Sequence, residues 1–306
     1  LNTSPDNPLL NRPLKGLYPP GSTYKPFMAL AALSSGAKDP DESINDPGYF
    51  VLGNHKFRDS SQGGHGQVDM KKSIVVSSDT YYYKLAIGMG VDLIHEYISP
   101  FGFGKQTGVD LTGEARGILP SSSWKLQRHG KQWLQGETPS IGIGQGYNTF
   151  TILQMAKATS IIANRGVMIK PRLFKGSREF NKSEFNYSKP VTQGKLNIQQ
   201  EWFDFVIDAM VEVNKSGTAS SVFGNSPFPI AGKTGTAQVF TIKQDEEYDS
   251  EKVPERLKDH SLYIGFAPVD KPKIALAVVV ENGGFGVTTA TPIAKLVFDF
   301  YLAKKR

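Results

Sequence analysis

Two side chains able to do covalent chemistry lie three positions apart in the stretch YPPGSTYKPFMALAALSSG, residues 18–36. Residues with this spacing share one face of a helix, so Ser22 and Lys25 are expected to approach each other. A serine hydroxyl is a weak nucleophile until a base takes its proton, and a lysine kept neutral by burial or a nearby cation can be that base. The start of a helix also favours a developing anion. The pair predicts either a helix cap beside an unrelated lysine or a nucleophile beside its base.

Two further polar motifs follow along the chain. Residues 77–79, SSD, separate an apolar segment from a helical pattern, and alone they are typical of a helix N-cap. Residues 233–236, KTGT, lie on a predicted strand, and alone they indicate a strand with a glycine kink or bulge. The order of the three motifs (helix start, turn between helices, strand) is much more specific than any one of them.

Taken together, the motifs match the Ser-x-x-Lys, Ser-Asp-Asn and Lys-Thr-Gly signature of penicillin-binding proteins and class A β-lactamases. The chain resembles the transpeptidase domain of a class B penicillin-binding protein and is most similar to the elongation-type subgroup, penicillin-binding protein 2. The resemblance runs from about residue 8 to residue 300, and it includes the stretches FRD followed by GHG, GIGQGYNTFTILQMAKA, ERLKDHSLYIGFAP and ENGG. Asp79 stands where Asn is common, as in elongation-type members, and a carboxylate only accepts hydrogen bonds where an amide would also donate.

The resemblance implies a serine-type D,D-transpeptidase that β-lactam antibiotics inhibit covalently. Ser22 would attack the carbonyl of the penultimate D-alanine of a peptidoglycan stem peptide, and Lys25 would take its proton. Ser77 would lie between Lys25 and Lys233 and pass the proton to the leaving D-alanine, with Asp79 completing the middle motif. The amine of a second stem peptide would then attack the acyl-enzyme and complete the cross-link.

The catalytic strand has implied binding roles as well. The backbone N–H groups of Ser22 and Thr236 would form the oxyanion hole, and such a donor is worth about 3 kcal/mol in other acyl-transfer enzymes. The hydroxyls of Thr234 and Thr236 would hold the terminal carboxylate of the substrate. The donor peptide would lie along residues 231–238 as an added strand, and Gly235 would let the two backbones come close.

These motifs require elements that bring them together. The pattern predicts a helix from residue 22 that ends at Gly36, with Pro26 in its first turn. Residues 37–70 and 105–139 are typical of loops, and residues 174–198 of an exposed excursion. Further helices are predicted within residues 69–104, 150–166, 199–214 and 291–306, and strands within 228–240, 261–269 and 273–283, with a charged loop between the first two strands.

Helices in the middle of the chain and strands late in it, without βαβ alternation, favour an α+β class with an antiparallel sheet. The resemblance implies the penicillin-binding and serine β-lactamase-like fold, with an antiparallel sheet of about five strands flanked by helices and an all-helical lobe. We expect one transpeptidase domain over residues 1–306. It would comprise a lead-in (1–21), a mostly helical lobe (22–215), and sheet strands with a C-terminal helix (216–306).

By the same resemblance, the whole protein would carry a membrane anchor and a pedestal domain that this chain lacks. The chain opens without Met and without the basic and apolar segments of a signal peptide, so we interpret it as a piece of a longer protein. The whole protein would work at the periplasmic face of the bacterial cytoplasmic membrane. Its partner there would be a membrane glycosyltransferase of the elongation machinery.

Bulk composition excludes several function classes. The chain has 306 residues, of which 39% are hydrophobic and 21% charged, as in soluble globular proteins. It contains no cysteine, which rules out disulfides, thiolate chemistry and cysteine-type zinc sites. The net charge of +6 is predicted to be spread along the chain. Without a basic stripe with interleaved aromatic residues, we expect no nucleic-acid partner.

No cofactor is expected. Gly142, Gly144 and Gly146 resemble part of a dinucleotide-binding loop, but no strand precedes them, so tight packing near the floor of the active site is the preferred interpretation.

Asp46, Asp59 and His65 could form a metal site, but they need a fourth ligand, and Ser78 is a poor one. We therefore predict no metal, with Asp59 and His65 hydrogen-bonding to hold their loop against the Ser77 turn.

Two alternative functions share the same motifs. A serine β-lactamase would need a carboxylate that activates water, for which Glu114 is the candidate, and the interval from Ser22 to Lys233 is longer than a compact lactamase needs. A non-catalytic β-lactam sensor would be acylated once and would signal through a membrane partner. Stable stoichiometric labelling with penicillin argues against the lactamase, and exchange of D-amino acids onto a substrate argues against the sensor.

Overall fold

The computed structural model describes residues 7–239 and 253–303, so the predicted charged loop lies largely outside the described residues. Its main sheet is antiparallel, with the strand order β11-β10-β9. The strands are β9 (Ala231–Ala237), β10 (His260–Ala267) and β11 (Ile274–Val280), where the three strands were predicted.

The expected count of about five strands is wrong for the main sheet, which has three strands within the described part of the chain. Only three late segments combine β-branched residues with length. Other extended residues pair outside this sheet, as Tyr18 does with Phe150 in an isolated bridge.

The two faces of the sheet have different neighbours. Helices α9 (Ser220–Phe223) and α10 (Ala290–Ala303) contribute Phe223 and Phe298, and Phe223 stacks on Tyr263 of β10. Side chains alternate between the faces of a strand, so Lys233 and its cross-strand neighbour Ile264 lie on the face opposite Tyr263. On this face Lys233 reaches the helical part of the molecule, where its Nζ donates to Ser77 Oγ at 2.9 Å.

Helix α2 (Lys25–Ser35) occupies the centre of the core, and every residue from Lys25 to Leu33 is buried. A helix that is apolar on all sides must be enclosed by other elements, and α4 and α8 pack against it. It ends at Gly36 in the left-handed conformation, as predicted. It begins three residues later than predicted, because Gly21–Tyr24 form the 3₁₀ turn η1 with Pro26 in the following first α-turn.

The middle motif lies between two helices, α3 (Met70–Val75) and α4 (Asp79–Ile98). Helix α4 is interrupted at Gly90, which has a left-handed φ of 73°, where one predicted helix ends and the next begins. A 3₁₀ turn, η2 (Ser99–Phe101), follows. The remaining long helices are α7 (Ile152–Ala163) and α8 (Gln200–Lys215), both as predicted, and α8 packs beside β9.

Residues 37–70 are more ordered than the loop that was predicted. Strand β1 (Ile44–Asp46) pairs with β4 (Gly66–Val68), and β2 (Tyr49–Leu52) pairs with β3 (His55–Arg58). These strands are only three or four residues long, so they are too short to show the apolar alternation that identifies a strand. Short helices complete the polar segments of the chain: α1 (Arg12–Lys15), α5 (Ser122–His129), η3 (Gln135–Glu137), α6 (Thr138–Gly142) and η4 (Glu255–Leu257).

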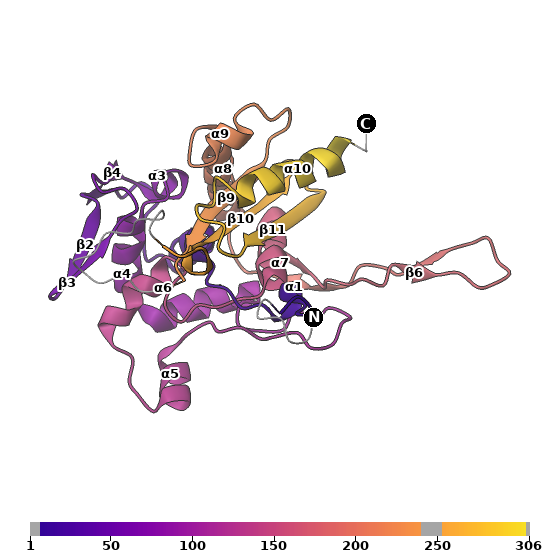
Figure 1. The fold of residues 1–306 in the computed structure, drawn as a ribbon, viewed down its shortest axis with the longest axis horizontal. Helices are drawn as coiled ribbons and strands as arrows, with labels where there is room; N and C mark the ends of the chain where they lie inside the picture. Colours follow the sequence, from indigo (N-terminus) through magenta and orange to yellow (C-terminus); the bar gives the residue numbers. More distant parts are fainter. Residues whose placement is uncertain (1–6, 240–252, 304–306) are drawn as a thin grey trace.

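The predicted excursion is a long two-stranded arm that projects from the body of the molecule (Figure 1). At its base, β5 (Val167–Ile169) pairs with β8 (Thr192–Lys195), and farther out β6 (Gly176–Ser177) pairs with β7 (Asn186–Tyr187). We call residues 170–195 the arm. None of the helices within residues 7–239 and 253–303 has the length and apolar character needed to span a bilayer.

Candidate active site

Ser22 lies in the turn η1, directly before α2. In a 3₁₀ turn, residues three apart eclipse each other, so the turn brings Ser22 and Lys25 onto the same side. The Lys25 backbone N–H donates to the Ser22 carbonyl, which closes this turn. Within the described part of the chain, the Ser22 hydroxyl makes no hydrogen bond, and it remains partly exposed. The structure therefore presents this hydroxyl to solvent without a partner.

The Lys25 side chain is fully buried and directed at the middle motif. Its Nζ donates to the Ser77 carbonyl at 2.6 Å, to Ser77 Oγ at 3.1 Å and to Asp79 Oδ1 at 2.6 Å. Three hydrogen bonds exhaust the donors of an ammonium group. Lys25 thus contacts both Ser77 and Asp79, and its amine must be neutral before it can accept a proton from Ser22.

Ser77 lies between the two lysines. Its Oγ is 3.1 Å from Lys25 Nζ and 2.9 Å from Lys233 Nζ, so the structure brings all three motifs together at this hydroxyl. Ser77 has a left-handed φ of 63°, which is unusual for a residue other than glycine. The cap of α4 comes from Ser78, whose Oγ accepts from the Tyr81 N–H. The N-cap that the SSD motif predicts is therefore Ser78, and the Ser77 side chain contacts the lysines instead.

Burial sets the protonation tendencies of the groups around Ser77. Burial, reinforced by the positive charge of Lys25, holds the pKa of Lys233 well below its usual value. Burial also raises the pKa of Asp79, although the neighbouring Lys25 ammonium opposes this shift. The site therefore favours a neutral Lys233 and makes a protonated Asp79 accessible.

Strand β9 is the edge strand of the main sheet, with β10 on one side and no strand on the other within the described residues. Its edge adjoins the turn η1. A Cβ on Gly235 would lie 2.7 Å from Thr23 Cγ2, and a Cβ on Gly21 would lie 2.5 Å from the Thr236 carbonyl oxygen. The predicted oxyanion donors, Ser22 N–H and Thr236 N–H, thus belong to adjoining backbone segments. Glycine is required where two backbones approach this closely.

The predicted carboxylate-binding hydroxyls have partners that the sequence analysis missed. Thr234 Oγ1 is 2.7 Å from Thr218 Oγ1, and Thr236 Oγ1 accepts from the Gly286 N–H at 3.2 Å. Thr218 follows α8, and Gly286 precedes α10, so both arrive from distant parts of the sequence. No local pattern in either segment marks them as neighbours of the catalytic strand.

The glycine-rich segment that precedes α7 forms the floor beneath Ser22, as predicted. The Gly21 N–H donates to the Gly144 carbonyl at 3.0 Å, and a Cβ on Gly144 would lie 2.3 Å from the Gly21 carbonyl oxygen. Gly144 is also left-handed, with φ 74°. The floor is held in turn by Glu137, whose carboxylate accepts from Lys125 Nζ at 2.6 Å.

Asp46, Asp59 and His65, which we call the Asp–His cluster, do come together, with their ligand atoms all within 4.8 Å of one another. Ser78 Oγ donates to Asp46 Oδ2 at 2.6 Å, and the Thr80 N–H donates to Asp59 Oδ2 at 2.8 Å. The two carboxylates therefore hold the Ser77 turn.

The expected hydrogen bond between Asp59 and His65 is wrong, because His65 Nε2 lies 3.8 Å from Asp59 Oδ1 and is buried without a hydrogen-bond partner. The donor types suit a divalent cation, and the absence of a metal stays a prediction.

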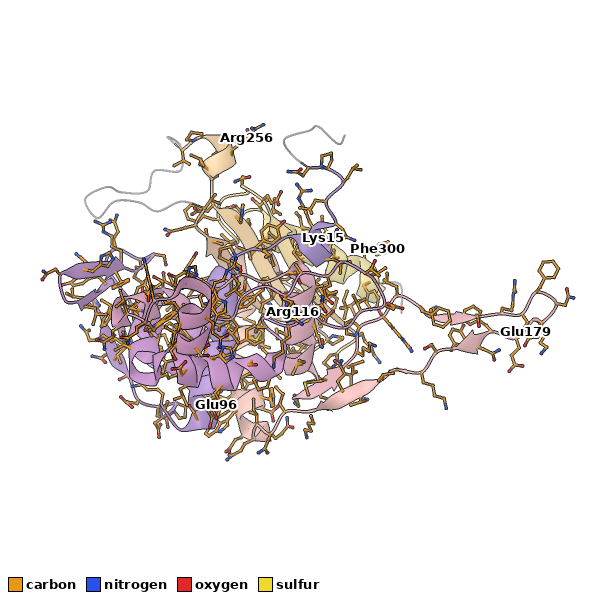
Figure 2. The ribbon with its side chains drawn as sticks, turned by 90° about the horizontal axis from the view of Figure 1, so that it is seen from below. Lys15, Glu96, Arg116, Glu179, Arg256 and Phe300 are labelled. Atoms are coloured by element: carbon orange, nitrogen blue, oxygen red, sulfur yellow. The ribbon has the colours of Figure 1, made fainter. Side chains whose placement is uncertain are left out.

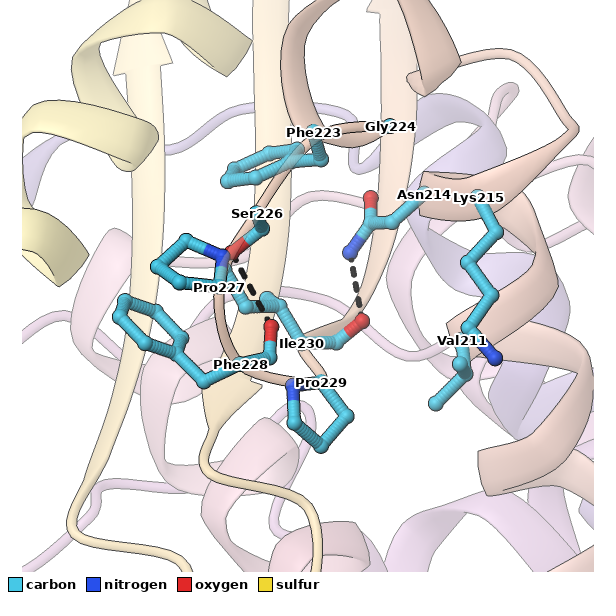
Figure 3. A pocket seen from close by; sticks show the side chains of 10 residues that line it. All are labelled: Val211, Asn214, Lys215, Phe223, Gly224, Ser226, Pro227, Phe228, Pro229 and Ile230. Atoms are coloured by element: carbon cyan, nitrogen blue, oxygen red, sulfur yellow. Dashed lines mark hydrogen bonds between the residues drawn. The ribbon is translucent and has the colours of Figure 1, made fainter.

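Glu114, the candidate water-activating carboxylate of a lactamase, is held in its own loop. Its two carboxylate oxygens accept the backbone N–H groups of Thr107 and Gly108. A separate cavity of about 320 Å³ lies between the end of α8, α9 and residues 226–230, where Asn214 Nδ2 donates to the Ile230 carbonyl (Figure 3). None of the motif residues lines this cavity.

Comparison with known proteins agrees with this geometry. The family model described as the penicillin binding protein transpeptidase domain matches residues 1–299. Peptidoglycan D,D-transpeptidase MrdA of Acinetobacter baumannii is 44% identical over 98% of this chain and is covered over 45% of its own length. The chain thus spans about half the length of the curated relatives it matches.

Two solved structures are similar over nearly the whole chain. Pseudomonas aeruginosa PBP2 in complex with WCK 5153 has a TM-score of 0.85 and 40% identity, covering 99% of this chain and 65% of that one. Helicobacter pylori PBP2 in complex with MreC has a TM-score of 0.80 and 31% identity, covering 98% of this chain and 53% of that one.

Proposed function

Because the chain belongs to the penicillin-binding protein transpeptidase family, we propose that it is a serine D,D-transpeptidase that cross-links peptidoglycan stem peptides and is acylated by β-lactams. The family and the penicillin-binding fold predicted from the sequence are confirmed. The observation that carries the proposed chemistry is the Ser77 hydroxyl, which is hydrogen-bonded to the amines of both Lys25 and Lys233.

Acylation begins with a proton transfer inside the site. The Lys25 ammonium gives a proton to the Asp79 carboxylate across the 2.6 Å hydrogen bond, which leaves a neutral amine and a protonated carboxyl. Ser22 Oγ then bonds to the carbonyl carbon of the penultimate D-alanine while its proton passes to Lys25, and the carbonyl electrons move to the oxygen. The backbone N–H groups of Ser22 and Thr236 stabilise this oxyanion.

Collapse of the tetrahedral intermediate breaks the bond to the terminal D-alanine, and the leaving amine must gain a proton. Ser77 supplies it and is reprotonated by Lys25, with Lys233 on its other side. The amine of a second stem peptide then attacks the acyl-enzyme, gives up a proton along the same route in reverse, and restores the Ser22 hydroxyl. The donor peptide lies along the open edge of β9, with its terminal carboxylate at Thr234 and Thr236.

The setting of the whole protein is part of the proposal. We infer from the resemblance that it works at the periplasmic face of the cytoplasmic membrane, anchored by a segment outside this chain, with a membrane glycosyltransferase of the elongation machinery as partner. The complex of Helicobacter pylori PBP2 with MreC supports a place in a larger assembly. No cofactor is needed for any step.

Labelling with a fluorescent penicillin, followed by intact-mass analysis and peptide mapping, tests the nucleophile. Wild type should be acylated once, at Ser22, and Ser22→Ala should lose labelling while keeping its melting temperature. Ser35→Ala, at the other end of α2 and also partly exposed, is the matched control and should label normally. Labelling of Ser22→Ala at the wild-type rate would contradict the assignment of Ser22 as the nucleophile.

Two further measurements separate the alternatives. Turnover of penicillin would favour a β-lactamase, but the involvement of Glu114 in backbone hydrogen bonds argues against it as a water-activating base. Incorporation of a labelled D-amino acid onto a D-Ala-D-Ala thioester would support the transpeptidase. Stoichiometric acylation without any exchange would instead indicate a β-lactam sensor.

A further inference from the structure

The arm carries most of the net charge of the chain. Residues 170–195 contain seven Lys or Arg and two Glu, a net charge of +5, whereas the whole chain carries +6. The expectation that charge is spread along the chain is therefore wrong.

The arm is built to stand away from the body of the protein. Figures 1 and 2 show it projecting alone, with Glu179 at its far end. At its base, the Asp110 carboxylate accepts the N–H groups of Leu173 (2.7 Å) and Phe174 (2.8 Å), and these two hydrogen bonds, the largest effects, lower the pKa of Asp110. Arg172 ties the two strands together through Ser188 Oγ at 2.6 Å. The root is thus held while the distal part is open to solvent.

Apolar rings are interleaved with the charges on this distal part. Phe180 is fully exposed near the tip, and the exposed rings of Phe185 and Tyr187 lie 4.6 Å apart. Gly176 pairs with Tyr187, and a Cβ at this position would come within 2.6 Å of the Phe185 ring, so glycine makes room for the aromatic pair. Lys175 Nζ lies 5.7 Å from the centre of the Tyr187 ring.

These features have no explanation within the described fold. A ribbon of two strands has no core of its own, and like charges along it repel one another. Exposed rings grouped between cations favour a partner that is both anionic and able to cover apolar faces. Among the described residues, nothing from the body of the protein covers Phe180, Phe185 or Tyr187.

We propose that the arm binds the anionic glycan–peptide polymer on which the proposed transpeptidase acts, at a distance from Ser22. This inference rests on the proposed function, because it takes that polymer as the substrate. The stem peptides of such a polymer end in carboxylates, which pair with exposed Lys and Arg side chains. Its sugar rings present C–H faces, which pack on the negatively charged faces of aromatic rings. An arm of this kind keeps the domain on its polymer between cross-linking events.

Co-sedimentation of the protein with purified peptidoglycan sacculi tests the proposal at about 50 mM salt, where screening is weak. The charge variant is Lys175→Gln, Arg178→Gln and Lys182→Gln combined, and the ring variant is Phe180→Ser with Phe185→Ser. The matched control is a triple Gln variant at exposed lysines elsewhere on the molecule, namely Lys71, Lys131 and Lys271.

We expect the charge variant to bind sacculi about tenfold or more weakly than wild type, since each exposed ion pair contributes up to about a fivefold factor. The ring variant should also bind sacculi more weakly than wild type, and the control should bind them as wild type does. Added salt should weaken the binding of wild type to sacculi more than it weakens the binding of the charge variant. Wild type already acylated by penicillin should still bind, which separates the arm from Ser22.

Three results would overturn the proposal. They are arm variants that bind like wild type, a control that weakens as much as the charge variant, and wild type that sediments with anionic phospholipid vesicles but not with sacculi. Equal melting temperatures of all variants show that the fold is intact. Penicillin labelling of Ser22 in the same samples tests the proposed function independently, so its failure and that of the arm are distinguishable.

Discussion

Replacing Asp79 with Asn removes the proton acceptor that lies 2.6 Å from Lys25. The Lys25 side chain is fully buried and that of Asp79 is 15% exposed, so solvent replaces the carboxylate poorly. A hydrogen bond to a charged group is worth about 1.5–3 kcal/mol and a neutral one about 0.5–1.5 kcal/mol. Replacing the charge-assisted hydrogen bond with a neutral one therefore weakens the contact with Lys25 by about 1–1.5 kcal/mol.

The internal transfer from Lys25 to Asp79 moves no proton to solvent, so its extent is independent of pH. Wild type should consequently keep a plateau in its acylation rate toward acidic pH, down to the raised pKa of Asp79, below which the carboxyl takes its proton from solvent. In Asp79→Asn the Lys25 proton must leave to solvent. The acylation rate of the variant should therefore fall about tenfold for each pH unit below its midpoint, with no plateau.

The assay is the second-order rate constant for acylation by a fluorescent penicillin, measured from about pH 5 to about pH 9. Asp208→Asn, the same change at an exposed position on α8, is the control and should retain the plateau. Melting temperatures confirm that each variant is folded. Parallel pH profiles for wild type and Asp79→Asn would refute the reasoning, because they would show that Asp79 takes no part in deprotonating Lys25.

Three other predictions concern the support of the site. Burial raises the pKa of Glu137, but its hydrogen bonds outweigh burial and hold the pKa below its usual value. Glu137→Gln should therefore lower the free energy of unfolding in urea by about 1–3 kcal/mol at neutral pH, and this difference should vanish as pH falls through the lowered pKa. A difference that stays constant with pH would contradict the pairing of Glu137 with Lys125. Gly144→Ala should slow penicillin acylation about tenfold or more by displacing Gly21. Gly36 is also left-handed, but a Cβ there meets nothing within 4 Å, so Gly36→Ala should be acylated at the normal rate. Equal rates for the two variants would refute the role of the floor. Elemental analysis should find no stoichiometric divalent ion, because the Asp–His cluster has only a hydroxyl as its fourth group, and one zinc per chain would overturn this expectation.

The parts of the fold that could be predicted carry strong local signals. Helix α2 combines a continuous apolar run with a glycine stop, and the late strands β10 and β11 are largely apolar and bounded by turns. The meeting of Ser77 with both lysines was predictable only through the family resemblance. No spacing in one sequence reveals a contact between residues as far apart as Lys25 and Lys233.

The parts that could not be predicted depend on tertiary context. The strands in residues 37–70 are too short to show alternation, and they are ordered by Asp46 and Asp59, which bind the Ser77 turn from outside. The three-residue delay in the start of α2 arises because Gly21 packs against Thr236 and Gly144, which tightens the preceding turn. The roles of the site residues themselves remain predictions that the variants above address.

At Ser77 the left-handed backbone lowers the stability of the fold, whereas the side chain serves the proposed activity. An L-residue in this conformation costs about 1–2 kcal/mol relative to one that adopts it freely, and glycine would relieve that cost. Glycine would also remove the hydroxyl that joins Lys25 to Lys233. The relieved backbone strain is offset by two buried amines that lose a hydrogen-bond partner, so Ser77→Gly should change the melting temperature little while abolishing penicillin acylation; heat resistance therefore does not report on this position.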